Sequence, residues 1–337
     1  MNLNFSYKKQ SIEYTSGVFL KGPSYRCHII KYKTLYPSPA KGSETVEVYT
    51  FVPKGKVIGS SLILHGLGTR NIKFFLWMGS HLASAGITTS ILILPGNYTR
   101  VEHNSVSGKN FLWPDIKVMF RVWENAIVDI QSTLDLLDQL NYWSDNNCSI
   151  GYCLGGMLLS IVSTFEKRLN DKILITTGCS FPEIFYNSSS TKFIRKMVEG
   201  GYEADFNLHD KNYLIKTYKE QLPLVRSLDL KGLVKNPEIH PLFKIDPLSY
   251  AHLLDKSKFT FIDALFDEIL SFKSRALMYR EMRGATRYTL PITHTGWLPF
   301  ERFLAQYVMI KLNISDKKLI KKALKKIETF VIPWDKN

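Results

Sequence analysis

The chain has 337 residues, 45% of them hydrophobic and 22% charged, a length that suits one large α/β domain with an insertion or two domains. Its net charge of +14 is spread along the sequence without the pattern of a nucleic-acid-binding module, so we expect no nucleic acid partner. No uninterrupted apolar stretch approaches the roughly 20 residues that span a bilayer.

The first part of the chain alternates segments typical of strands with segments typical of helices. A turn is expected at 54–56, the helix of 74–85 should end at Gly86, and an irregular polar loop should cover 97–114 after Pro95 and Gly96. The expected strands are 25–35, 47–52, 60–64 and 88–94, and the expected helices are 74–85 and 117–140.

The alternation continues after the long helix. A short strand over 148–150 is followed by a helical segment that reaches Phe165. Three further strands are expected over 172–177, 259–264 and 287–292. Strands that alternate with helices predict a mostly parallel central sheet with helices on both faces.

The alternation fails between Phe181 and Leu254. This stretch holds charged helical pieces and several prolines, and it is too long for an ordinary connection between a helix and a strand. We interpret it as a cap that covers the site and shapes its pocket. The expected domains are therefore a core over 1–180 and 255–337, with the cap over 181–254.

The six residues 151–156 read Gly-Tyr-Cys-Leu-Gly-Gly, with an expected strand before them and a helix after them. In a G-x-nucleophile-x-G turn, the glycines let two backbones cross without a Cβ clash. The turn lifts the central side chain, here Cys153, to the N-terminus of the next helix, where the dipole favours a thiolate. The alternative is a buried structural cysteine bracketed by glycines.

With this elbow and the order of its elements from about 45 to 313, the chain resembles the α/β-hydrolases. The resemblance implies a nucleophile, an acid and a histidine in that chain order. Cys153 takes the first place, and His294 follows the last strand as the histidine. The acid should follow the strand of 259–264, which favours Asp267 and leaves Asp263, inside that strand, as the alternative.

The same resemblance implies an oxyanion hole made of two backbone N–H groups. They would belong to Leu154, directly after the nucleophile, and to Leu67 in the His-Gly loop. Gly66 and Gly68 would let that loop approach closely, and His65 would hold the loop in shape rather than transfer protons.

The elbow also resembles those of dienelactone hydrolases and polyhydroxyalkanoate synthases, which implies chemistry on a cysteine. We expect a hydrolase that cleaves a carboxylic ester, lactone or thioester through a Cys-His-Asp triad and a thioester acyl-enzyme. One alternative is an acyltransferase or synthase-like enzyme that uses the same cysteine. Another is a catalytically silent hydrolase fold used for binding.

The expected ligand is a small, fairly apolar acyl substrate, because aromatic residues are common around the first loops. We expect no cofactor and no metal, since the four cysteines show no metal-ligand spacing. Their scatter, together with the lack of an apolar signal segment in 1–13, favours the cytoplasm. The oligomeric state stays open.

Near its end the chain predicts a basic amphipathic helix. Its apolar residues suit docking on the core with a solvated lysine face, and contact with a membrane surface is the minority alternative. The lysines of this cluster are Lys317, Lys318, Lys321, Lys322, Lys325 and Lys326.

Overall fold

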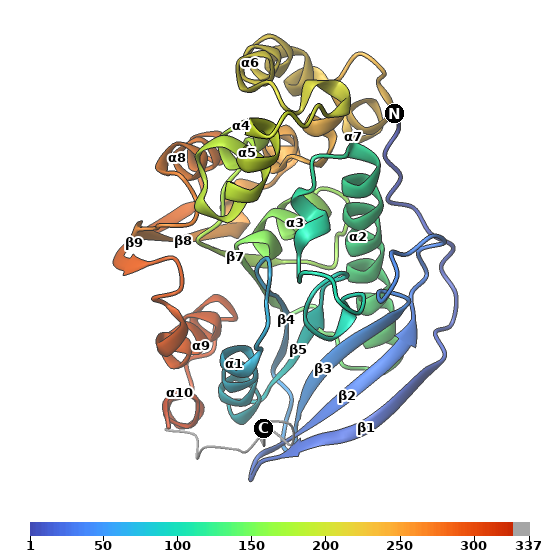
Figure 1. Cartoon of the computed structure of the whole chain (residues 1–337). Helices are drawn as coiled ribbons and strands as arrows, with labels where there is room; N and C mark the ends of the chain where they lie inside the picture. The colour runs from blue at the N-terminus through green and yellow to red at the C-terminus, as the bar shows by residue number, and fades with distance from the viewer. Residues whose placement is uncertain (326–337) are drawn as a thin grey trace.

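The computed structural model describes residues 1–325, whose frame is a single sheet of nine strands (Figure 1). The strand order is β1-β2-β3-β5-β4-β6-β7-β8-β9, antiparallel from β1 to β5 and parallel from β5 to β9. The predicted mostly parallel sheet is therefore confirmed. The strands are β1 (Tyr14–Lys21), β2 (Tyr25–Lys33), β3 (Thr45–Pro53), β4 (Gly59–Leu64), β5 (Ile87–Ile93), β6 (Cys148–Tyr152), β7 (Asp171–Ile175), β8 (Phe259–Phe266) and β9 (Thr286–Thr293).

Helices cover both faces of this sheet (Figure 1). On one face α1 packs against β3 and β5 and against α9 and α10, and on the other face α2 packs against α3. Because of this double cover, β4, β5 and β6 are buried along their whole length. The core helices are α1 (Lys73–Ser84), α2 (Ile116–Gln139), α3 (Leu154–Val162), α8 (Phe272–Glu281), α9 (Glu301–Lys311) and α10 (Lys317–Leu324).

Two of the differences from the sequence prediction concern β1 and the end of α3. The sequence did not predict β1, which pairs only with β2 at the edge of the sheet and exposes most of its residues, so it lacks the alternation of a half-buried strand. Helix α3 ends at Val162 rather than near Phe165. There the hydroxyls of Ser163 and Thr164 donate to the carbonyls of Leu159 and Ile161 and so satisfy the last turn.

The segment 181–254 lies between β7 and β8 and consists of helices and 3₁₀ turns. It holds α4 (Phe181–Asn187), α5 (Lys192–Glu199), α6 (Lys211–Ser227) and α7 (Leu230–Lys235), which gather at the top of Figure 1, together with the turn η3 (Ser189–Thr191). Its last turns, η5 (Pro241–Ile245) and η6 (Pro247–Leu253), pack against α2 and α3. The end of the segment therefore lies among the core helices.

One buried carboxylate joins the two ends of this segment. The Oδ1 and Oδ2 atoms of Asp246 accept hydrogen bonds from the main-chain N–H groups of Ser180 (3.0 Å) and Phe181 (2.7 Å). The hydroxyl of Tyr218 donates to the same carboxylate at 3.1 Å. Burial raises the pKa of Asp246 to about 6.

The predicted basic helix corresponds to α10, which packs on α9 and α1. Ala323 is buried, and Leu319 and Ile320 pack against the core, so the apolar side faces the protein. Lys325 follows the helix, while Lys326 lies outside the described residues. Within residues 1–325, no helix is both long and apolar enough to cross a bilayer.

Candidate functional site

Cys153 stands on a sharp turn between β6 and α3. Its backbone has φ 51° and ψ −112°, a conformation that non-glycine residues rarely adopt. A Cβ on Gly151 would lie 2.6 Å from the carbonyl oxygen of Gly155, and one on Gly155 would collide with the carbonyl of Leu64. Both glycines are therefore required for the two backbones to cross.

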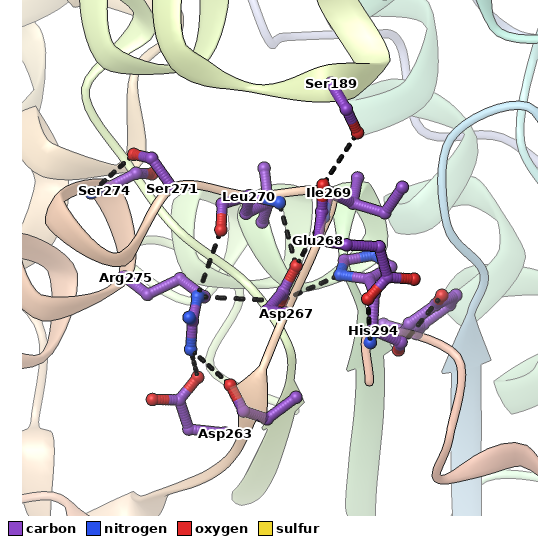
Figure 2. A network of polar contacts seen from close by, with 12 residues as sticks. Ser189, Asp263, Asp267, Glu268, Ile269, Leu270, Ser271, Ser274, Arg275 and His294 are labelled. Carbon is purple, nitrogen blue, oxygen red and sulfur yellow. Dashed lines mark hydrogen bonds and ion pairs between the residues drawn. The ribbon is translucent and has the colours of Figure 1, made fainter. Parts of the chain in front are cut away.

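His294 and Asp267 meet close to this turn. The Nδ1 atom of His294 lies 2.8 Å from Oδ2 of Asp267, a hydrogen bond drawn in Figure 2. The other carboxylate oxygen of Asp267 accepts the N–H groups of Ile269 (2.9 Å) and Leu270 (2.8 Å). These bonds fix the carboxylate in one orientation and leave Nε2 of the imidazole free to face another partner.

Cys153 lines the same cavity as His294 and affects its charge. Burial alone lowers the pKa of His294, but the negative charge of Cys153 and hydrogen bonds to Asp267 and Cys153 raise it to about 10. For Asp267, burial acts in the opposite direction, yet the bonds from His294 and from two main-chain N–H groups lower its pKa. At neutral pH His294 is therefore a positively charged imidazolium beside the carboxylate of Asp267.

The alternative acid, Asp263, does not reach His294. It lies on β8, where its two carboxylate oxygens pair with Arg275 and Arg287. Arg275 is buried and also approaches Asp267, with its Nε 3.6 Å from Oδ2. Of the two candidate carboxylates, the structure thus brings only Asp267 to the histidine.

Arg275 also holds the ends of the loop that carries Asp267 (Figure 2). Its guanidinium donates to the main-chain carbonyls of Ala264 (2.7 Å) and Leu270 (3.3 Å), on either side of Asp267. This residue was not predicted from the sequence because it lies inside α8, where an arginine is ordinary. No pattern in the sequence marks it.

Glu268 forms a second contact with the histidine that was not predicted from the sequence. Its Oε2 accepts the main-chain N–H of His294 at 3.0 Å. Its own main-chain carbonyl accepts the hydroxyl of Ser189, from the turn η3, at 2.8 Å (Figure 2). The segment above the site is thereby bonded to the loop that holds the acid. The adjacency of Glu268 to Asp267 is the one signal that could have suggested it.

Tyr152 packs directly beside the pair. Its ring centroid lies 5.3 Å from that of His294 and 5.0 Å from that of Trp297, and Phe75 closes the group at 6.3 Å from Tyr152. These rings exclude water from one side of the imidazole.

Leu67 and Leu154 face the same cavity as Cys153 and His294. Within residues 1–325, neither the N–H of Leu67 nor that of Leu154 has a protein acceptor. The neighbouring Gly68 N–H is taken by the side chain of Asn97 at 3.0 Å. Two unpaired N–H groups beside a nucleophile can donate to a developing negative charge.

His65 lies beneath the loop that holds Leu67 and is fully buried. Its Nε2 accepts the N–H of Leu94 at 2.9 Å, so Nδ1 bears the proton and donates to the carbonyl of Gly66 at 2.8 Å. Burial lowers its pKa to about 4, which keeps the ring neutral. The ring binds two main-chain groups and does not line the cavity.

The cavity above Cys153 has a volume of about 220 Å³. Cys153 and His294 lie at its base with exposed fractions of 7% and 3%. No cluster of three or more potential metal ligands occurs in residues 1–325. The hydrophobic residues of the lining are Leu67, Leu112, Leu154, Met157, Ile184, Ile269 and Leu270.

Several solved structures share the arrangement of the chain. Acetyl xylan esterase 1 from Thermoanaerobacterium sp. JW/SL YS485 has a TM-score of 0.55 at 14% identity, over 91% of this chain and 89% of the esterase. The acetyl xylan esterase from Paenibacillus sp. R4 has a TM-score of 0.53 at 13% identity, over 89% of each chain. The chain has the α/β-hydrolase fold.

Pyrococcus horikoshii acylaminoacyl peptidase is similar as well, with a TM-score of 0.53 at 13% identity. The match covers 90% of this chain and 44% of the peptidase. No family model matches the sequence, and no curated protein does. At these identities the likeness concerns the fold, and the function must be argued from the site.

Proposed function

We propose that the protein hydrolyses carboxylic esters, lactones or thioesters. Cys153 would be the nucleophile, His294 would move the proton and Asp267 would orient the imidazole. One observation carries the proposal: His294 binds Asp267 through Nδ1 at 2.8 Å and lines the same cavity as a cysteine on a strained elbow. A nucleophile, a base and an orienting carboxylate in that order are the parts of an acyl-transfer triad.

In the first half-reaction, the sulfur of Cys153 attacks the acyl carbonyl carbon, and the π electrons of that carbonyl move to its oxygen. The N–H groups of Leu154 and Leu67 donate to this oxyanion. When the carbonyl forms again, the bond to the leaving group breaks, and the leaving oxygen or sulfur takes the proton of His294. The acyl group then remains as a thioester on Cys153.

In the second half-reaction, a water molecule attacks the thioester carbon and gives one proton to His294. The tetrahedral intermediate collapses with departure of the Cys153 sulfur, which keeps the bonding electron pair. The products are a carboxylic acid and the original thiolate–imidazolium pair, and one water is consumed for each acyl bond cleaved. Asp267 stabilises the imidazolium in both steps.

The cavity directly above Cys153 has room for a short segment of an acyl group. A cavity of about 220 Å³ is below the usual range of about 300–1,000 Å³ for ligand pockets. Its hydrophobic lining suits an apolar chain, in line with esterases among the structures of this fold. Since all four cysteines are free and buried, we also propose that the enzyme works in the reducing cytoplasm.

The proposal is tested with para-nitrophenyl acetate and butyrate. The wild type should release para-nitrophenol, and Cys153→Ala should lower kcat/KM by at least about 1,000-fold. Cys179→Ala is the matched control, because Cys179 is another buried free thiol and does not line the cavity. Mass spectrometry of the wild type should detect an acyl adduct on the peptide that contains Cys153.

Hydrolysis that survives Cys153→Ala would overturn the assignment. Product analysis distinguishes the two alternative functions of this site. Transfer of the acyl group to an added alcohol in preference to water would identify an acyltransferase. No turnover and no adduct with any activated ester would identify a silent fold used for binding.

A further inference from the structure

A second hollow adjoins the cavity above Cys153. It has a volume of about 530 Å³ and shares Leu67, Leu112 and Ser190 with the lining of the first cavity. One wall is the loop 106–113 and the other is helix α5, which contributes Phe193 and Met197. A substrate bound at Cys153 can therefore extend past Leu67 and Leu112 into this hollow.

A lysine lies in the second hollow. The ammonium of Lys109 is 4.0 Å from the ring centroid of Trp113, which stacks on Phe193 with a centroid distance of 6.0 Å. Lys109 is half-buried, and no carboxylate of residues 1–325 forms an ion pair with it. Among the residues that line the two hollows, none is an aspartate or glutamate. The site thus offers a positive charge on apolar walls without a counter-ion from the described protein.

The lining indicates which half of the substrate reaches Lys109. The leaving group must lie at His294, which gives it a proton, and His294 lines the first cavity and not the second. The second hollow shares Leu67 with the first cavity but includes neither Leu154 nor His294. The part of the substrate that extends into it is therefore the acyl chain.

We propose that the second hollow binds the far end of the acyl chain and that Lys109 pairs there with a carboxylate. The preferred substrates are then esters or thioesters of linear dicarboxylic acids with one acid group free. This inference rests on the proposed function and names its substrate class. The apolar walls strengthen the pairing, because a charge interaction grows as water is excluded.

The test compares acyl groups that differ only at the far end. The substrates are para-nitrophenyl monoesters of dicarboxylic acids of increasing length, and para-nitrophenyl esters of the unsubstituted fatty acids of the same lengths. All substrates have the same leaving group, so the chemical steps at Cys153 and His294 are the same in both series. At the length that reaches Lys109, kcat/KM for the monoester should exceed that for the fatty ester by about tenfold.

The variant Lys109→Gln should abolish this preference, so that each monoester and its matched fatty ester are hydrolysed at similar rates, and Lys109→Arg should retain most of it. Lys73→Gln is the matched control, because the Lys73 ammonium also lies over a tryptophan ring, 5.3 Å from Trp77, but lines neither hollow. Added salt should weaken the preference in the wild type and have little effect in Lys109→Gln.

Each outcome bears on one of the two proposals. A wild type that hydrolyses both series without preference, or a preference that persists in Lys109→Gln, overturns the role of Lys109 and leaves the esterase intact. Equal losses on both series in Lys109→Gln also overturn it, since they indicate a structural effect. Hydrolysis of neither series, or activity that survives Cys153→Ala, overturns the proposed function itself.

Discussion

The main-chain N–H of His294 donates to Oε2 of Glu268 at 3.0 Å, while the imidazole of the same histidine binds Asp267. Two consecutive carboxylates thus hold one residue, Asp267 by its side chain and Glu268 by its backbone. These two hydrogen bonds restrain both the backbone and the side chain of His294. Its position relative to Cys153 then depends on the loop after β8 rather than on β9 alone.

This contact predicts that Glu268 acts on the position of His294. Glu268→Ala should lower kcat about tenfold, because it leaves a buried N–H without an acceptor, at a cost of about 1–3 kcal/mol. Glu268→Gln keeps an acceptor oxygen and should stay within about twofold of the wild type. Steady-state kinetics and thermal denaturation test this. If Glu268→Ala and Glu268→Gln lose the same share of kcat, Glu268 does not act through an uncharged acceptor oxygen.

The two aspartates of β8 and its loop should separate activity from stability. Asp267→Asn removes the charge that stabilises the imidazolium and should lower kcat roughly 100-fold or more. Asp263→Asn removes the negative charge that pairs with Arg275 and Arg287 and should lower the free energy of unfolding by about 3–5 kcal/mol, with little loss of kcat per folded enzyme.

Urea denaturation and kinetics on both variants check this separation. The assignment of the acid is wrong if Asp263→Asn loses more activity than Asp267→Asn at a temperature where both are folded. Asp263 would then have to act on the histidine through Arg275.

His294 should titrate far above an ordinary histidine. Its pKa of about 10 depends on the charge of Cys153, so the imidazolium should persist through neutral pH in the wild type and titrate at lower pH in Cys153→Ala. NMR of the imidazole Cε1–H signal measures both values. Identical titration curves in the two proteins would exclude a thiolate–imidazolium pair.

His65 should make the fold sensitive to mild acid. Its pKa is about 4 in the folded protein, against 6.5 for an unperturbed histidine, so the unfolded chain binds the proton more readily between these values. The stability that the neutral ring contributes is therefore present above about pH 6.5 and lost as the pH falls toward 4.

Between about pH 7 and 5, His65→Gln should remove up to roughly 2 kcal/mol of the pH dependence of the unfolding free energy. The exposed His103 provides the control variant, His103→Gln, which should follow the wild type. His81, whose pKa burial also lowers to about 4, keeps its share of the pH dependence in both variants. Parallel curves for His65→Gln and the wild type would disprove the role of His65.

The sequence alone predicted the elements whose physics is local. Glycines at 151 and 155 indicate a crossing of backbones, and apolar runs bounded by glycine or proline mark the buried strands. The edge strand β1 was not predicted, because most of its residues are exposed and neither of its faces is buried. A pattern of burial cannot appear where little is buried.

The contacts between distant segments could not be predicted in the same way. The order of Asp263 and Asp267 along the chain is compatible with either acid, and the choice depends on the arginines that fold back from α8 and β9. The Glu268 contact joins residues 26 positions apart through a main-chain N–H, which leaves no trace in residue type. Such bonds form only when distant segments of the chain come together in the fold. No periodic pattern in the local sequence indicates them.

Asp246 has a consequence for how far the length of segment 181–254 can vary. Because one carboxylate binds the main chain at Ser180 and Phe181, the outgoing chain and the returning chain are held together at Asp246. Doubling the length of a flexible loop closed in this way costs only about 0.6 kcal/mol. The parts of segment 181–254 that line neither hollow can thus change in length during evolution or in the laboratory, while the elbow of Cys153 keeps the same form.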